Sequence, residues 1–239
     1  GETTRERFHF DNEGPRHRVF LEAFEMADRL VTAREFLAFM ADGGYARPEL
    51  WLSLGWATRE AEGWTEPFYW ERDETSPTGF SHFTLAGMRP VDPNEPVGHL
   101  SYFEADAYAR WAGARLPSEF EWEVAAQQAG PISSGGFVGG GRLHPAPDEA
   151  TVGGDGAATP HLRQVFGQLW QWTQSQYTPY PGYQPVPGAL GEYNGKFMAN
   201  QFVLRGASVF TSRSHARPTY RNFFPPEVTW QLTGLRLAR

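Results

Sequence analysis

The sequence contains no cysteine, no cluster of basic residues and no long apolar run. The absence of cysteine excludes disulfides, thiolate metal ligands and a cysteine nucleophile. With no run of lysine or arginine and a net charge of −7, a nucleic-acid partner is not expected. No apolar stretch approaches the roughly 18 residues of a membrane-spanning helix, and the N-terminus lacks the apolar core of a signal peptide. These absences predict a cytoplasmic protein that enters no membrane.

Aromatic residues, glycine and proline are abundant instead. Nine Trp, nine Tyr and eighteen Phe make up 15% of the 239 residues, and Gly and Pro occupy 26 and 19 positions. Rings buried among many turns are typical of a domain with little regular structure. A few helices combined with short strands predict a single α+β domain over residues 1–239.

Three segments carry the pattern of a helix N-terminus, in which Ser or Thr is followed three residues later by Glu. The pairs are Thr32 with Glu35, Ser101 with Glu104, and Ser118 with Glu121. Two or three helices are therefore expected. In the third of them, Glu119, Glu121 and Glu123 are predicted to form a solvated face rather than an acid/base pair.

Short strands are predicted from apolar runs bounded by turn residues. They are Phe68–Trp70, Phe80–Leu85, Phe202–Arg205 and Leu235–Leu237. Residues 45–98 are otherwise expected to form hairpins and loops, and the Gly- and Pro-rich residues 130–160 a long loop within the one domain. Trp170 and Trp172 alternate along a further segment, and their predicted role is core packing.

The seven histidines show no HxH or HxxxH pair that would indicate a metal site. A facial iron triad requires three converging ligands with open positions. The sequence therefore predicts no metal bound by this chain alone. His99, just before the second expected helix, is predicted to be structural.

Four ordered segments resemble the signatures of the sulfatase-modifying-factor superfamily, which includes the formylglycine-generating enzymes. They are residues 95–123, 167–173, 203–208 and 233–238. The resemblance implies a C-type-lectin-like fold with short strands, two or three helices and much irregular loop. The lack of cysteine excludes the copper chemistry of the formylglycine-generating enzymes. Arg115, Arg205 and Arg236 lie in these signatures and are predicted to be structural ion-pair partners.

Further segments resemble the C-terminal domain of ergothioneine-biosynthesis sulfoxide synthases. They are residues 11–17, 43–45, 177–183, 192–198 and 219–226. This resemblance implies a substrate-pocket domain that helps join a cysteine-type thiol, cysteine or γ-glutamylcysteine, to trimethylhistidine with iron(II) and O₂. Such synthases hold iron through three histidines of an N-terminal DinB-like domain. This chain contains no such domain, so that domain and its iron are expected in cis or in trans.

The resemblance implies that Asn222, Phe223 and Phe224 face the substrate pocket. Aromatic rings suit a trimethylammonium group through cation–π attraction, and Asn222 suits a carboxylate. Adjacent rings in an extended segment point in opposite directions, so at least one Phe is expected in the core. Tyr180 and Tyr193 lie in turn-rich loops and complete the predicted substrate-binding set. The sequence identifies no catalytic residue.

A second function remains open at this stage. C-type-lectin-like folds also serve as stand-alone modules that bind a ligand or a protein without catalysis. The match over residues 220–226 favours the synthase, whereas the lack of metal ligands favours the module.

Overall fold

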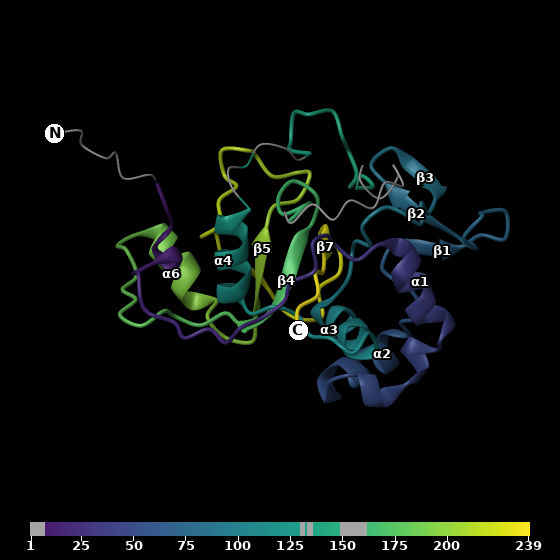
Figure 1. Cartoon of the computed structure of the whole chain (residues 1–239), viewed down its shortest axis with the longest axis horizontal. Helices are drawn as coiled ribbons and strands as arrows, with labels where there is room; N and C mark the ends of the chain where they lie inside the picture. Colours follow the sequence, from purple (N-terminus) through teal and green to yellow (C-terminus); the bar gives the residue numbers. More distant parts are fainter. Residues whose placement is uncertain (1–7, 130–131, 133–135, 149–161) are drawn as a thin grey trace.

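The computed structural model describes residues 8–129, 132, 136–148 and 162–239. It contains a three-stranded sheet of order β1-β2-β3 and a four-stranded sheet of order β6-β5-β4-β7. Figure 1 shows the small sheet and α1 at one end of the molecule, α6 at the other, and the four-stranded sheet between them. Short strands joined by long irregular segments confirm the predicted α+β class.

Five α-helices lie within the described residues. They are α1 (Ala33–Ala41), α2 (Ser53–Glu62), α3 (Tyr102–Trp111), α4 (Glu119–Gln128) and α6 (Ala189–Lys196). The helices α1, α3 and α4 begin at the predicted capping boxes, all three of which are formed. None of the described helices is long and apolar enough to cross a membrane.

The helices α2 and α6 depart from the sequence prediction. Residues 45–98 contain α2 as well as the hairpin, and α6 lies in a segment with no predicted helix. Within the described residues, neither N-cap makes a side-chain hydrogen bond, since Leu52 and Gly188 occupy those positions. Both helices therefore lack the N-terminal signal that identified the other three.

The strands are short, as expected. They are β1 (Trp70–Arg72), β2 (Phe80–Thr84), β3 (Gly87–Pro90), β4 (Trp170–Gln176), β5 (Phe202–Gly206), β6 (Asn222–Phe224) and β7 (Thr233–Gly234). The strands β2 and β5 confirm the predictions, and β1 starts at the last residue of the predicted strand. The predicted strand Leu235–Leu237 is wrong, because those carbonyls accept irregular bonds from the N–H groups of Ala27 and Val31. Much of the predicted 130–160 loop lies outside the described residues.

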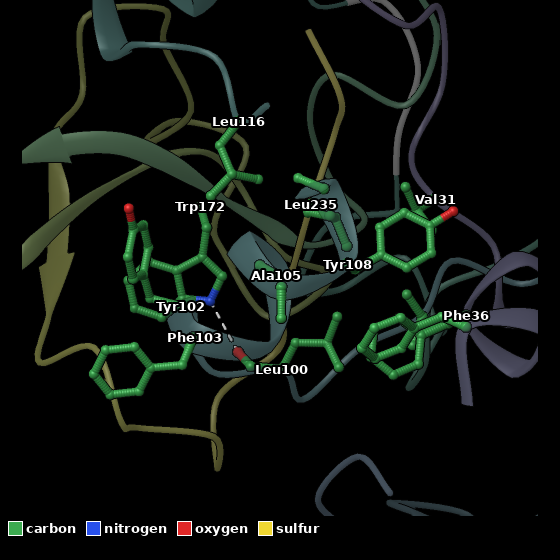
Figure 2. Close-up of a cluster of buried hydrophobic side chains, with 14 of the residues drawn as sticks. Val31, Phe36, Leu100, Tyr102, Phe103, Ala105, Tyr108, Leu116, Trp172 and Leu235 are labelled. Atoms are coloured by element: carbon green, nitrogen blue, oxygen red, sulfur yellow. Dashed lines mark hydrogen bonds between the residues drawn. The ribbon is translucent and has the colours of Figure 1, made fainter. Parts of the chain in front are cut away.

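The main core packs α1 and α3 against the four-stranded sheet (Figure 2). Trp172 is fully buried there, and its Nε1 donates a 2.8 Å hydrogen bond to the carbonyl of Leu100. This position confirms the core role predicted for Trp172. Trp170 lies two residues earlier on β4 and is only half-buried. Its indole therefore remains available to line a surface cavity.

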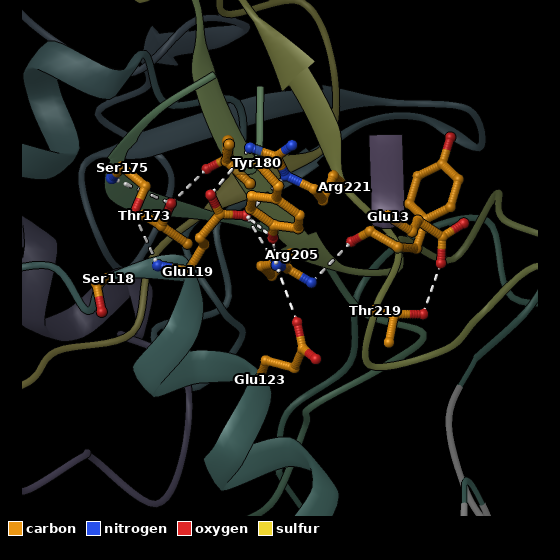
Figure 3. A network of polar contacts seen from close by, with 12 residues as sticks. Glu13, Ser118, Glu119, Glu123, Thr173, Ser175, Tyr180, Arg205, Thr219 and Arg221 are labelled. Atoms are coloured by element: carbon orange, nitrogen blue, oxygen red, sulfur yellow. Dashed lines mark hydrogen bonds and ion pairs between the residues drawn. The ribbon is translucent and has the colours of Figure 1, made fainter. Parts of the chain in front are cut away.

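A buried ionic network fixes α4 to the sheet (Figure 3). Glu119 is 2% exposed and accepts bonds from Arg205 at 2.8 Å and from Arg221 at 2.9 and 3.0 Å. The Tyr180 hydroxyl donates a fourth hydrogen bond to Glu119 at 2.9 Å. Burial raises the pKa of Glu119, but the two guanidinium groups outweigh burial and hold that pKa below its ordinary value.

The predicted solvated face of α4 is therefore wrong for Glu119 and Glu121. Glu119 is the first residue of α4 and faces the sheet, where β5 and the approach to β6 bring two arginines beneath it. Glu121 is also buried, because it closes the capping box and pairs with Arg115 at 2.7 Å. The ion-pair roles predicted for Arg115 and Arg205 are confirmed. Arg236 is buried too, but it donates to an amide and to carbonyl oxygens rather than to a carboxylate.

Candidate functional site

A cavity of about 360 Å³ opens beside the four-stranded sheet. Its walls come from β2, from the first residue of β4, from β6, and from residues 143–144 and 230–232. This volume lies within the roughly 300–1,000 Å³ range of small-molecule sites. Segments far apart in the sequence thus meet at one concave surface.

The register of β6 decides which of its side chains reach this cavity. Asn222 and Phe224 line it, whereas Phe223 points to the opposite face of the sheet. Phe223 is 8% exposed and stacks on Tyr177 with ring centroids 4.0 Å apart. The expectation that at least one of the two phenylalanines lies in the core is confirmed.

Aromatic rings form much of the cavity wall. They belong to Tyr69, Phe83, Trp170, Phe210, Phe224 and Trp230. The rings of Phe224 and Trp230 meet edge to face at 5.8 Å, and those of Tyr69 and Phe83 lie 5.8 Å apart. Among the described residues, no Asp, Glu, Lys or Arg lines the cavity. The wall is therefore an uncharged aromatic surface.

Two of the residues that line the cavity have a strained backbone conformation. Tyr69 and His99 have φ angles of 70° and 61°, and they are two of only four non-glycine residues with positive φ in the described segments. Such conformations cost of order 1–3 kcal/mol each and cluster at functional sites. Their rings meet edge to face at 4.9 Å. Burial, and next the neighbouring His144, lower the pKa of His99 to about 4, so its imidazole is neutral at pH 7.

Two side-chain amides contribute to the polar part of the wall. The Asn222 Oδ1 accepts a 3.0 Å bond from the N–H of Phe223, which orients the side chain. Gln231 is 8% exposed, and neither its Oε1 nor its Nε2 has a partner in the described part of the chain. A buried amide without partners costs about 1–3 kcal/mol. Gln231 therefore carries an unsatisfied donor and an unsatisfied acceptor beside the cavity.

Comparison with known proteins places this chain in a family. A family model described as "Sulfatase-modifying factor enzyme 1-like domain" matches residues 1–239. The chain belongs to this family. A formylglycine-generating enzyme of Streptomyces coelicolor is 33% identical over all of this chain and 85% of its own length. The solved structure of PvdO from Pseudomonas aeruginosa shares the fold, with a TM-score of 0.58 at 19% identity over 96% of this chain and 85% of its own.

Other relatives are named hercynine oxygenases. The protein of Mycolicibacterium thermoresistibile is 37% identical over 98% of this chain, and that of Mycobacterium tuberculosis is 36% identical over 95%. This chain covers 54% and 55% of those two proteins, respectively. It therefore spans about half the length of the hercynine oxygenases that it matches.

The five predicted substrate-binding residues are divided between different parts of this sulfatase-modifying-factor domain. Asn222 and Phe224 lie at the cavity, and Phe223 lies behind it. Tyr180 is buried and its hydroxyl donates to Glu119, while Tyr193 is 57% exposed and contacts the ring of Phe197. Neither tyrosine lines the cavity.

Sequence reasoning missed several cavity residues of this domain. Trp230 and Gln231 lie just ahead of the fourth family signature, separated from it by Leu232, and that position is their only sequence signal. Tyr69 was assigned to a strand, whereas it lies before β1 in a left-handed conformation. Trp170 was assigned to the core, and it also lines the cavity.

Three potential metal ligands meet behind the cavity, although the sequence predicts none for this chain. They are His82 on β2, Glu95 and His144, and their ligand atoms all lie within 4.8 Å of one another. Burial raises the pKa of Glu95, but His144 and Arg89 outweigh burial and lower that pKa below its ordinary value. No sequence spacing could reveal this group, because its members come from three separate segments.

Proposed function

We propose that this chain is the substrate-pocket domain of an iron(II)- and O₂-dependent sulfoxide synthase that joins a cysteine-type thiol to trimethylhistidine. The observation that carries the proposal is the uncharged aromatic cavity with its unpartnered amide. Relatives named hercynine oxygenases, 35–37% identical, support the substrate, because hercynine is trimethylhistidine. Ergothioneine-related oxidation is the broader role that these relatives support.

The rings suit the cationic end of trimethylhistidine. A quaternary ammonium has no N–H to donate, so a carboxylate cannot hold it by a hydrogen bond, but ring faces attract it. Each such contact contributes about 0.5–2 kcal/mol, more as water is excluded. Phe224 and Trp230 meet at one wall and Trp170 lies on another element of the same cavity. These three rings are proposed to surround the trimethylammonium group.

The two amides suit the remaining polar groups of the substrate. The Nε2 of Gln231 can donate to a carboxylate oxygen while its Oε1 accepts from an imidazole N–H. Asn222 lies on the same face of β6 as Phe224 and is proposed to donate to the same carboxylate. This arrangement orients the imidazole ring within the cavity.

Iron is proposed to come from a DinB-like domain outside this 1–239 domain, in cis or in trans. When bound, iron with O₂ supplies the oxidising chemistry, while the residues of this chain bind and orient the substrate. Apolar side chains at the cavity remain exposed, with Leu85 at 62%, Leu143 at 49% and Trp230 at 60%. Exposed apolar surface of this kind marks an interface, and we assign it to the iron-binding domain.

The proposal is tested on this chain together with an iron-binding domain, supplied in cis or in trans. With iron(II), O₂, trimethylhistidine and either cysteine or γ-glutamylcysteine, mass spectrometry should detect a sulfoxide. Its mass should equal that of both substrates plus one oxygen atom and minus two hydrogen atoms, which leave with the second oxygen atom of O₂ as water. Binding of trimethylhistidine without any such product would instead support a stand-alone binding module. No binding at all would contradict both functions.

Replacing Phe224 by Leu is expected to weaken trimethylhistidine binding about threefold to tenfold, because one cation–π contact is lost while apolar volume is kept. Histidine carries a primary ammonium, which is more strongly hydrated and gains less from a ring face, so its weaker binding should fall less. Calorimetry with both ligands measures the two affinities. Phe20→Leu is the matched control, because Phe20 is 83% exposed and not at the cavity. Equal losses for the two ligands would argue against an ammonium contact at Phe224.

A further inference from the structure

A second, much smaller cavity of about 10 Å³ lies beside the aromatic one. His82, Glu95, His99 and His144 all line it. A space of about 10–15 Å³ accommodates one water or one ion and no organic ligand. This small cavity is therefore too small to be part of the substrate pocket, although His99 and His144 line both.

Its lining leaves imidazole nitrogens without partners. His82 is 5% exposed, and its Nε2 has no hydrogen-bond partner in the described residues. The Nδ1 of His99 is likewise buried and unpartnered within that part of the chain. A buried nitrogen without a hydrogen-bond partner carries an uncompensated desolvation cost. A water molecule or an ion bound in the cavity would remove that cost.

The separation of one ligand pair suits a bound ion. The His144 Nε2 lies 3.4 Å from the Glu95 Oε2. Two ligands at about 2.0–2.2 Å from a tetrahedral ion are themselves separated by roughly 3.4 Å. The Glu95 carboxylate also accepts bonds from Arg89 at 2.6 and 2.7 Å, and outer contacts of this kind orient metal-binding carboxylates.

We propose that His82, Glu95 and His144 form a binding site for one divalent transition-metal ion held by this chain alone. Two imidazoles and one carboxylate are a ligand set suited to borderline ions such as Zn²⁺ and Co²⁺. With only three protein ligands, the ion would keep a fourth tetrahedral position for a water molecule. The ion would cross-link β2 to the segment around residue 144 and so fix one wall of the aromatic cavity.

This inference goes beyond the proposed function and is tested without either substrate. The chelator-treated chain is titrated with Zn²⁺ by calorimetry and with Co²⁺ by visible absorption. One equivalent should bind, and the melting temperature should rise with ion concentration. His144→Ala should weaken binding more than about a hundredfold, since even loss of an outer-shell partner costs about 10–100-fold.

The His144 variant is chosen because this side chain lies on a half-buried loop, so its loss should leave the fold intact. His9→Ala is the matched control, since His9 is exposed and its one hydrogen bond within the described residues is to the carbonyl of Phe10. His82→Asn supplies a second test from β2. Absence of saturable binding, or equal affinities for the chain and His144→Ala, would overturn the site. Neither result would affect the prediction for trimethylhistidine binding by Phe224→Leu.

Discussion

Replacing Glu119 by Gln is expected to lower the free energy of unfolding by about 3–5 kcal/mol, one of the largest effects of any single substitution here. The change conserves shape but removes the negative charge that faces Arg205 and Arg221, which are 0% and 2% exposed. Two guanidinium groups would then lie in the interior without their shared carboxylate. Urea denaturation followed by tryptophan fluorescence measures this loss.

The charge of Glu119 within this network also determines how the free energy of unfolding depends on pH. The folded-state pKa of Glu119 lies below its ordinary value of 4.5, so its stabilisation is present above that value. It is lost as pH falls through the folded-state pKa. In the Glu119→Gln variant, the part of the stability loss at acid pH that comes from protonation of Glu119 should be absent. Glu192→Gln is the control, because its exposed pair with Lys196 contributes less than about 0.5 kcal/mol. Equal effects of the two substitutions would contradict the network's role.

Replacing Gln231 by Leu should affect binding and stability in opposite directions. Affinity for trimethylhistidine is expected to fall about tenfold to a hundredfold, because a bond to a charged group contributes about 1.5–3 kcal/mol. Stability without ligand should hold or rise by about 1 kcal/mol, because an unpartnered buried amide is removed. Calorimetry and thermal denaturation measure the two effects.

Gln168 provides the matched comparison for Gln231. It is also 8% exposed, but its Oε1 accepts a 2.9 Å bond from the N–H of Ala146. Gln168→Leu should therefore lower stability by about 1 kcal/mol. If Gln231→Leu is destabilising to the same extent and leaves affinity unchanged, Gln231 is a structural residue and our assignment of it to the substrate is wrong.

Local chemistry decided how much of the fold could be predicted. Helices with a capping box were found, because Ser or Thr at the N-cap and Glu three residues on specify a helix start. The helix α2 begins after Leu52 and α6 after Gly188, so neither carries that signal. Glu119 was misassigned for a different reason. Helix periodicity cannot show which face meets the arginines of strands more than 80 residues away.

The candidate site was predicted only where a family motif covered it. Asn222 and Phe224 lie in such a motif, and the two-residue repeat of a strand explains why Phe223 is separated from them. Gln231 could not be identified, because an unpartnered amide is a property of the folded chain. The grouping of His82, Glu95 and His144 could not be identified from the sequence either, because their three segments come together only on folding.

The alternation along β6 also bears on how this pocket can evolve. Substitutions at positions 222 and 224 alter the cavity while leaving the stack of Phe223 on Tyr177 untouched. A one-residue deletion or insertion in this strand would exchange the two faces and damage both at once. New ligand preferences are therefore accessible through point substitutions at alternate positions, and not through changes in the length of β6.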